Sequence, residues 1–380
     1  ELESGRSILD AVKKEGLDSI MLSDRPLAAQ IGGEGFNLRL TPKKDTQIHL
    51  LRYGEDMGRR VYERTLQFLF ILAMRKEFPR ARVCVRYSLG PGLFITVDGM
   101  EEPFNEEAAL KVETEMRRLV RLKLPLERRR ISIKEALSFY EQDGQADKAK
   151  LLKWRRFSYF DVYQIDGYMD YFYGEMAPDT SYADVFRVKY VHDGAVVLLM
   201  PRNDAPDVPS DYVDLPKLHA VFHQSDEWGK LMECATVNDL NTHIQNGTIR
   251  ELVRINEALH DRGYADIADK IVQKGAKAVL VAGPSSSGKT TSAHRISTQL
   301  RLQGCHPVML SLDDYYIDRD KIERDENGEI DLENINTLDI QRFGSDLAAL
   351  IRGEKVEVPR FDFTNGKRAP EGRILQLHDD

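Results

Sequence analysis

The feature that most constrains the fold is an apolar run that leads into a loop rich in glycine and serine, VLVAGPSSSGKTTSAHRI (residues 279–296). In this stretch Gly283, Gly288, Lys289 and Thr290 satisfy the spacing G-x-x-x-x-G-K-[ST] without a mismatch. A loop of this kind turns successive backbone N–H groups inward, and the helix that follows points its positive end at the same place. The stretch therefore predicts a strand, an anion-binding loop and a helix, in that order.

The side chains of this loop suit the phosphates of a nucleoside triphosphate. Glycine at positions 283 and 288 permits a close backbone approach, Lys289 can reach the β- and γ-phosphates, and the Thr290 hydroxyl can ligate Mg²⁺. The alternative, a chance turn before a helix, leaves the apolar run in front of the loop unexplained. We therefore expect ATP and Mg²⁺ as cofactors, with Thr290 as the Mg²⁺ ligand. The residues expected to bind the nucleotide are Gly283, Pro284, Ser285, Ser286, Ser287, Gly288, Lys289, Thr290 and Thr291.

Two acidic residues, Asp313 and Asp314, follow the next apolar run, PVMLSL (residues 307–312). This run is predicted to form a strand beside the loop's own strand in a parallel, right-handed βαβ unit, so that acids at its carboxyl end face the ligand. There Asp313 can accept a proton from an acceptor hydroxyl or help to order Mg²⁺. The alternative is that the acid pair only ends the strand and starts a turn. We favour catalysis for Asp313 and the turn for Asp314, because neighbours on an extended backbone point apart.

From Gly283 onward the segments GPSSSGKTT, DDYY, IDLENINTLD and VPRFDF follow one another to near the end of the chain. In order and spacing they resemble the uridine kinase and phosphoribulokinase group of P-loop kinases. The resemblance implies that Asp313 is the catalytic base for a nucleoside 5′-hydroxyl and that Lys289 assists catalysis. It implies substrate contacts from Asp313, Tyr316, Glu333, Phe361 and Phe363.

Three positions depart from the pattern of that group. Phe361 stands where the group has tyrosine, Glu333 is a longer acid than the usual one, and Gly366 stands where a histidine reads pyrimidine. These departures predict altered base contacts. The group continues with a strand ending in an EG motif, whose glutamate helps to hold Mg²⁺, and with an arginine-rich lid. This sequence stops before both and starts without methionine, so we expect a fragment that is inactive or weak alone.

Roughly residues 10–200 resemble a second family. The stretches GRRVYERTLQFLFILAMRKEF and YFDVYQIDGYMDYFYGEMAP resemble the amino-terminal editing-type domain of threonyl-tRNA synthetase, and the residues before them resemble a TGS module. The resemblance places Arg64, Phe68, Phe172 and Met176 where the synthetase has its histidine and cysteine side chains for editing. These side chains cannot replace imidazole or thiolate as proton carriers or metal ligands. We therefore expect the fold without hydrolysis of aminoacyl-tRNA.

Two further groups of residues have a functional and a structural interpretation. His219, His223, Cys234 and His243 could together suggest a zinc site, but no CxxC or HExxH pattern accompanies them, and we favour a structural role. The basic cluster at residues 117–134 could contact RNA. Acidic residues occupy the sequence before it, from Glu101 onward, so we favour a solvent-exposed helix face.

The fold class expected for the 380 residues is α/β and multidomain. The predicted domains are a TGS-like β-grasp module (1–51), a synthetase-like α+β domain with a degenerate site (52–216), a helical connector (217–275) and an incomplete parallel α/β P-loop kinase domain (276–380). The net charge of −8 provides no basic field that would recruit nucleic acid or an anionic membrane. The three dispersed cysteines favour the reducing cytoplasm.

The sequence thus predicts an ATP-dependent kinase that transfers the γ-phosphate to a nucleoside 5′-hydroxyl. Two alternatives stay open: a P-loop kinase for another small alcohol, such as a sugar phosphate or a pantothenate-like acid, and a non-catalytic, ATP-binding regulatory or RNA-associated module. The expected partner is a nucleoside or similar small molecule, without membrane or nucleic acid, and a homo-oligomer stays open.

Overall fold

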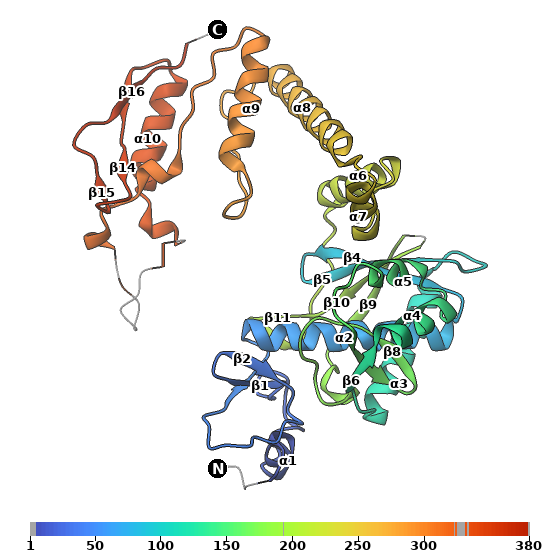
Figure 1. Cartoon of the computed structure of the whole chain (residues 1–380). Helices are drawn as coiled ribbons and strands as arrows, with labels where there is room; N and C mark the ends of the chain where they lie inside the picture. The colour runs from blue at the N-terminus through green and yellow to red at the C-terminus, as the bar shows by residue number, and fades with distance from the viewer. Residues whose placement is uncertain (1–4, 193, 323, 325–330, 333, 379–380) are drawn as a thin grey trace. The chain divides into compact units, whose positions relative to one another are not determined.

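The computed structural model describes residues 5–192, 194–322, 324, 331–332 and 334–378. The chain divides into two compact units, Glu1–Thr242 and His243–Asp380, and each is described by itself (Figure 1). Both units combine helices with small sheets, so the predicted mixed α/β, multidomain architecture is confirmed. The sequence-based boundaries after residues 51, 216 and 275 stay predictions.

The first unit begins with a small α+β module. Its helix is stabilised at the start by a reciprocal pair, because the Ser7 hydroxyl accepts from the Asp10 N–H and the Asp10 carboxylate accepts from the Ser7 N–H. The central strand pairs antiparallel with both of its neighbours. The elements are α1 (Ile8–Lys14), β1 (Ala28–Ile31), β2 (Glu34–Phe36) and β3 (His49–Leu51). Ile8 and Leu9 belong to the same buried cluster as the next helix, so one core runs through both parts.

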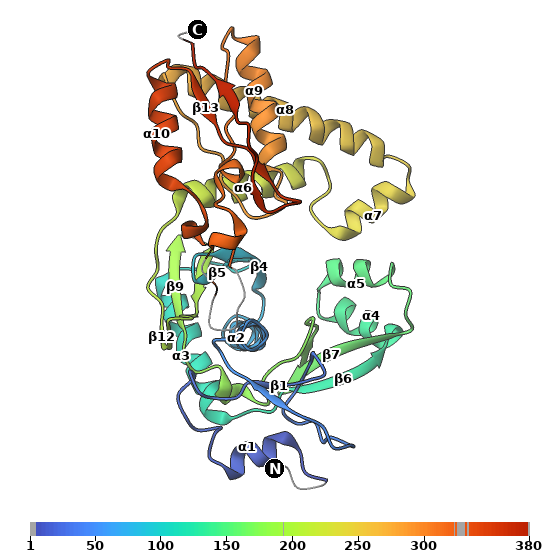
Figure 2. The ribbon, with the colours of Figure 1, turned by 90° about the vertical axis from the view of Figure 1, so that its left-hand side faces the viewer.

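That next helix, α2 (Asp56–Glu77), is the main support of the first unit. Its apolar residues recur at intervals of three and four, and its interior contains no proline, so one long helix forms and buries a broad face. Figure 2 shows α2 nearly end-on, with β4, β5 and β9 along one side and the β6–β7 arm reaching away on another. The four-stranded antiparallel sheet has the order β4-β5-β10-β9. Its elements are β4 (Arg82–Leu89), β5 (Gly92–Asp98), β9 (Arg187–His192) and β10 (Ala195–Leu199), with α3 (Glu106–Leu122) packed on β9.

Strand β10 is buried on both faces. Val196 and Leu198 belong to the core shared with α2, whereas Ala195, Val197 and Leu199 belong to a second cluster on the opposite face. This alternation is the two-residue period of a strand. Helix α6 (Pro216–Leu231) lies against that second face, and α7 (Val237–Gln245) follows it.

A smaller arm of the first unit has a core of its own. The sheet order is β6-β7-β8, and helices α4 and α5 close it over a cluster that includes Tyr140 and Phe160. Lys148 on α5 binds both oxygens of the buried Asp170 at 2.6 and 2.7 Å. The elements are β6 (Glu127–Ser132), α4 (Ile133–Gln142), α5 (Ala146–Leu152), β7 (Tyr159–Ile165) and β8 (Tyr168–Asp170); β11 (Pro201–Arg202), β12 (Ala205–Pro209) and the short helix η1 (Thr180–Tyr182) complete the unit.

The second unit has two small hydrophobic clusters. In the first, Ala268 on α8 packs against Ile296 and Leu300 on α9. In the second, Tyr315 packs with Leu350 on α10 and with strand β13. The elements are α8 (Ile249–Lys274), α9 (Lys289–Leu302), η2 (Leu312–Tyr315), η3 (Arg319–Lys321), η4 (Ile335–Thr337), α10 (Ile340–Ile351), β13 (Val356–Val358), β14 (Phe361–Asp362), β15 (Lys367–Arg368) and β16 (Arg373–Leu375).

The prediction of two parallel strands beside the glycine- and serine-rich loop is wrong. Residues 279–282 and 307–312 form no strand, and the strand pairs among the described residues of the second unit, β13-β16 and β14-β15, are antiparallel. Leu280 is 82% exposed. A parallel strand needs hydrogen-bonded neighbouring strands and apolar cover on both faces. Residues 279–282 are exposed, and residues 307–310 are half-buried, with Leu310 packed against the cluster around Tyr315, but neither run pairs with a strand among the described residues. Within the described part of the chain, no helix combines the length and the apolar character needed to cross a membrane.

Candidate functional site

The glycine- and serine-rich loop at residues 283–291 leads directly into α9. Gly288 is the residue before the helix and has φ of 83°, in the left-handed region that glycine adopts without strain. Ser286 also has a positive φ, 59°. The Ser292 N–H donates to the Gly288 carbonyl oxygen at 2.9 Å, so helical hydrogen bonding starts at the loop's last glycine. Free N–H groups of the first helical turn therefore face the loop, as an anion-binding site requires.

Lys289 folds back over the loop that precedes it. Its Nζ donates to the carbonyl oxygens of Gly283 and Pro284, at 2.9 Å in each case. A side chain at Gly283 would bring its Cβ within 2.8 Å of the Ser287 hydroxyl oxygen, so the Ser287 side chain would have to move. The ammonium group is thus held at the loop by neutral carbonyls, and phosphate oxygens would make stronger, charge-assisted bonds with it.

The two acids after the second apolar run have different surroundings. Asp314 Oδ1 accepts a hydrogen bond from the Phe361 N–H at 3.3 Å, which connects η2 to β14. Asp313 is exposed to solvent at the surface of η2. Asp314 therefore has a structural contact, whereas the Asp313 carboxylate is accessible to a substrate. The catalytic role of Asp313 stays a prediction.

Three of the residues expected to contact the substrate lie together, and we call Tyr316, Phe361 and Phe363 the aromatic cluster. The ring centroids are 5.6 Å apart for Tyr316 and Phe361, 5.2 Å for Phe361 and Phe363, and 6.2 Å for Tyr316 and Phe363. The Tyr316 hydroxyl donates to the carbonyl oxygen of Leu332 at 3.2 Å. The neighbouring Glu333 lies outside the described residues, so the substrate contact expected of it stays a prediction.

The P-loop and the aromatic cluster are separate in their contacts. Among the described residues, no hydrogen bond or ion pair joins residues 283–291 to Asp313 or to the aromatic cluster. The P-loop helix α9 is fixed instead to α8, where Arg295 binds Asp261 at 2.6 Å and Tyr264 contacts the Ser292 hydroxyl at 3.2 Å. The loop of residues 283–291 and the aromatic cluster are therefore held by different neighbouring elements.

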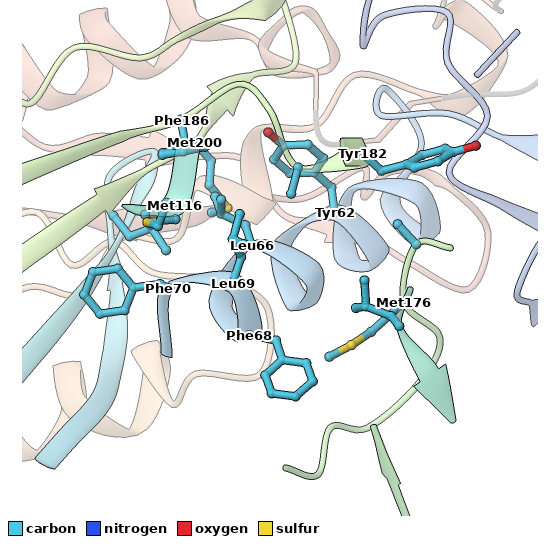
Figure 3. Close-up of a cluster of buried hydrophobic side chains, with 14 of the residues drawn as sticks. Tyr62, Leu66, Phe68, Leu69, Phe70, Met116, Met176, Tyr182, Phe186 and Met200 are labelled. Carbon is cyan, nitrogen blue, oxygen red and sulfur yellow. The ribbon is translucent and has the colours of Figure 1, made fainter. Parts of the chain in front are cut away.

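The four positions that the synthetase resemblance equates with editing residues lie together in the first unit. Phe68 and Phe172 have ring centroids 5.2 Å apart, and Phe68 and Met176 are fully buried in the core around α2 (Figure 3). Arg64 Nε donates to the Glu175 carbonyl oxygen at 2.9 Å. Burial lowers the pKa of Arg64. Apolar side chains and a guanidinium group fill the place, which supports the expected loss of editing chemistry.

Comparison with known proteins finds different relatives for the two ends of the chain. Residues 278–379 match the model of the Phosphoribulokinase / Uridine kinase family. The amino-terminal half is similar to Threonine--tRNA ligase from several bacteria. The protein from Clostridium kluyveri is 24% identical over 189 residues, which cover 50% of this chain and 29% of that protein. The Carboxydothermus hydrogenoformans protein is 27% identical over 175 residues, 44% of this chain and 26% of that protein.

The chain therefore combines a carboxy-terminal region that matches the phosphoribulokinase and uridine kinase family model with an amino-terminal region that is similar to threonine–tRNA ligases. The matched region spans less than a third of the length of these ligases. The resemblances to the kinase family and to threonyl-tRNA synthetase are thereby confirmed, whereas the TGS-like module and the nucleoside acceptor stay predictions. The activity of the whole protein is a matter of proposal.

His219 on α6, one of the residues considered for a zinc site, contacts aromatic side chains of the neighbouring sheet. The His219 Nδ1 lies 2.7 Å from the Tyr87 hydroxyl, and its ring centroid lies 4.7 Å from that of Phe94. Burial lowers the pKa of His219, and the nearby His192 and His223 lower it further. In the part of the chain that the structure describes, no group of three or more histidine, cysteine, aspartate or glutamate side chains is arranged to hold a metal ion.

The basic cluster at residues 117–134 is spread over α3 and β6, and acids accompany its arginines. Arg117 binds Glu113 at 2.7 Å, and Arg118 binds Glu115 at 2.6 Å. On β6, Arg128 and Arg130 bind Asp161, and Arg128 also binds Glu175 at 2.6 Å. These ion pairs at the surface are typical of a solvated face.

In the region that matches the kinase family model, the sequence did not reveal a polar contact that connects α10 to η2. Arg342 Nε donates to both oxygens of Asp346, at 2.7 and 2.9 Å, and Asp346 in turn accepts from the buried Tyr315 hydroxyl at 3.1 Å. Burial raises the pKa of Tyr315, and the Asp346 carboxylate raises it further. The sequence signal that could have indicated this contact is the i, i+4 spacing of Arg342 and Asp346, which brings the two side chains together once α10 forms.

Proposed function

We propose that this chain is part of an ATP-dependent kinase that transfers the γ-phosphate of ATP to an alcohol, with a nucleoside 5′-hydroxyl as the acceptor. The observation that carries the proposal is the loop of residues 283–291, whose lysine and helix start form an anion site within a domain that matches the kinase family. The proposed acceptor rests on the aromatic cluster that adjoins the Asp313 segment.

The reaction divides among a few side chains. The Asp313 carboxylate accepts the proton of the acceptor hydroxyl, whose oxygen then attacks the γ-phosphorus while the bond to the β-phosphate oxygen breaks and ADP leaves. Lys289 and the backbone N–H groups at the start of α9 stabilise the charge that develops on the phosphate oxygens. The aromatic cluster orients the acceptor by stacking against a planar ring.

The chain has a group suited to Mg²⁺ at the expected place. The Thr290 side chain lies exposed in the first turn of α9, and its hydroxyl makes no hydrogen bond within the described part of the chain. A hard oxygen ligand next to the triphosphate loop fits Mg²⁺, which takes most of its remaining ligands from water and phosphate. When bound, the ion would neutralise charge on the β- and γ-phosphates.

A panel of acceptors tests the proposal. The full-length natural protein should consume ATP when a nucleoside is present, and Asp313→Asn should lower the rate by at least about 100-fold, because general-base catalysis contributes on that order. Asp320→Asn, a change at an exposed acid of the neighbouring η3, is the matched control. Turnover with sugar phosphates or pantothenate-like acids, and with no nucleoside, would replace the acceptor but keep the kinase.

The ligase-like region favours a second candidate, an ATP-binding regulatory or RNA-associated module. Its support is the match of half of the chain to threonine–tRNA ligases at positions whose editing residues are replaced. The same Asp313→Asn variant decides between the two. If every measurable activity of the full-length protein survives this change, the function does not depend on phosphoryl transfer. We place the protein in the cytoplasm, where its free cysteines Cys84, Cys234 and Cys305 would stay reduced.

A further inference from the structure

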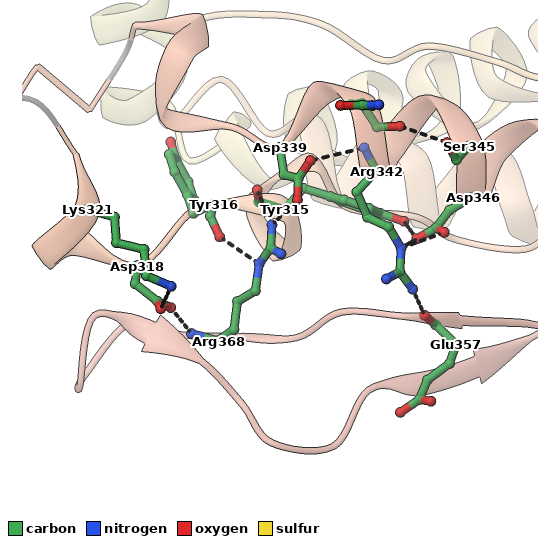
Figure 4. A network of polar contacts seen from close by, with 11 residues as sticks. Tyr315, Tyr316, Asp318, Lys321, Asp339, Arg342, Ser345, Asp346, Glu357 and Arg368 are labelled. Carbon is green, nitrogen blue, oxygen red and sulfur yellow. Dashed lines mark hydrogen bonds and ion pairs between the residues drawn. The ribbon is translucent and has the colours of Figure 1, made fainter.

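Arg368 on β15 lies between three parts of the acceptor side. Its Nε donates to the Tyr316 carbonyl oxygen at 3.1 Å, and its Nη2 donates to the Tyr315 carbonyl oxygen at 3.3 Å (Figure 4). The same Nη2 binds Asp339 Oδ2 at 2.9 Å. Its backbone N–H donates to Asp318 Oδ1, also at 2.9 Å. One residue therefore contacts both ends of the segment that follows Asp313.

Asp339, the residue before α10, connects Arg368 to the start of that helix and to Tyr315. Its Oδ1 accepts from the Arg342 N–H at 3.0 Å and so caps the helix, while its own N–H donates to the Tyr315 carbonyl oxygen at 2.9 Å. The hydrogen bond from the Arg342 N–H lowers the pKa of Asp339, and the Arg368 guanidinium lowers it further. The carboxylate therefore stays ionised at neutral pH, and its pair with Arg368 persists.

Arg368 is connected to the aromatic cluster through the hairpin. In the β14–β15 register, Phe361 lies opposite Arg368. The Phe361 N–H binds Asp314, the residue next to Asp313. The β14–β15 hairpin thus holds this segment at two points, through the Asp314 side chain at Phe361 and through the carbonyl groups of Tyr315 and Tyr316 at Arg368. Because Asp313 is exposed, its place depends on this backbone rather than on contacts of its own side chain.

We infer that Arg368 is a positioning residue of the acceptor site, which rests on the proposed function. By binding the carbonyl groups of Tyr315 and Tyr316 together with Asp339, it fixes the carboxylate of Asp313 relative to Phe361. A base must lie within hydrogen-bond reach of the hydroxyl that it deprotonates. The contacts of Arg368 therefore set the distance between the base and the ring that binds the acceptor.

The guanidinium group is suited to this task in a way that an ammonium group is not. Arg368 reaches two carbonyl oxygens and one carboxylate from a single planar group. Lysine has one nitrogen on a flexible stem and matches such a spread of acceptors less well. Arg368→Lys should keep the pair with Asp339, lose at least one carbonyl contact and give an intermediate effect.

Steady-state kinetics of the full-length protein test the inference. Arg368→Gln should lower kcat by about 10- to 100-fold and raise the acceptor KM, because small misplacements of reacting groups cost on that order. The KM for ATP should not change, because the contacts that the structure gives for Arg368 are with Tyr315, Tyr316, Asp318 and Asp339 and not with residues 283–291. Added guanidinium ion at non-denaturing concentration should restore part of the rate of Arg368→Ala. Arg352→Gln, which breaks the exposed pair with Glu354, is the matched control.

A second measurement distinguishes a failure of the inference about Arg368 from a failure of the proposed kinase function. Amide hydrogen exchange of residues 313–317 should be faster in Arg368→Gln, and exchange in α9 should not change. Unchanged kinetics and unchanged exchange in Arg368→Gln would overturn the inference, as would faster exchange spread evenly over the second unit. If the wild-type protein phosphorylates no alcohol, the proposed function fails, while the exchange measurement still decides whether Arg368 holds this segment.

Discussion

Tyr316 and Phe361 face each other with ring centroids 5.6 Å apart and ring planes inclined by 55°. Tyr316 directly follows η2, which carries Asp313, and Phe361 begins the hairpin β14–β15. Phe363 completes the aromatic cluster and is 52% exposed, so one edge of the cluster is open to a ligand. The pairing joins the segment of the proposed base to the element that would bind the planar part of the acceptor.

Phe361→Leu should weaken acceptor binding and leave nucleotide binding unchanged. Leucine keeps the apolar character but loses the face of the ring, and contacts between aromatic rings contribute about 0.5–1.5 kcal/mol beyond buried area. The acceptor KM should therefore rise by about 2- to 12-fold. Steady-state kinetics with varied acceptor measure the change, and Phe157→Leu, at an exposed ring of the first unit, is the control. An unchanged acceptor KM would remove the aromatic cluster from the acceptor site.

Lys289→Met should abolish tight binding of ATP. The ammonium group already lies at the loop, 2.9 Å from two carbonyl oxygens, and no other lysine occupies residues 279–296. Methionine has a similar length and no charge, so the phosphates lose their charge-assisted donor. Titration calorimetry with ATP measures the loss, and Lys277→Met, an exposed change ahead of the loop, should bind as the wild type does. Equal affinity in both variants would contradict the assignment of the loop.

Gly288→Ala and Gly263→Ala should change stability in opposite directions. Gly288 has φ of 83°, where a residue with a Cβ is strained by about 1–2 kcal/mol, so the alanine variant should destabilise the start of α9 and weaken ATP binding. Gly263 lies within α8 with no atom near its Cβ position, so alanine should stabilise that helix by about 0.5–1 kcal/mol. Urea unfolding measures both, and a stabilised Gly288→Ala would refute the left-handed conformation.

Parts of this fold followed from local sequence alone. The buried face of α2 was predictable because its apolar spacing is helical over its whole length, and α9 was predictable because the loop pattern specifies a helix after Lys289. The runs at 279–282 and 307–312 looked equally clear and form no strand. A strand depends on partners distant in sequence, and an apolar run cannot show whether those partners are present.

The candidate site also contains parts that the sequence could predict and parts that it could not. The nucleotide loop was predictable because all of its chemistry lies in consecutive residues. The aromatic cluster was anticipated only through the family resemblance, which named Tyr316, Phe361 and Phe363. Arg368 was not anticipated, because its role arises from a hairpin that brings β15 back to η2 and to the start of α10. Lone arginines are common on surfaces, and only the three-dimensional contacts distinguish this one.

The thermal stability of the first unit should fall as the pH drops below about 6.5. Burial between α6 and the sheet lowers the pKa of His219 below its ordinary value of 6.5, with His192 and His223 as further causes and Asp214 opposing them. The folded state therefore binds fewer protons than the unfolded state, so its stability is complete above the unfolded pKa and declines as the pH falls below it.

His219→Gln should flatten this dependence, because glutamine can still bind the Tyr87 hydroxyl but does not titrate. Unfolding of the wild type and the variant, followed by calorimetry between pH 7.5 and 5.5, measures the slope. His260→Gln, at an exposed histidine of α8, should keep the wild-type slope. A slope in His219→Gln equal to that of the wild type would show that α6 is not held against the sheet through a neutral His219.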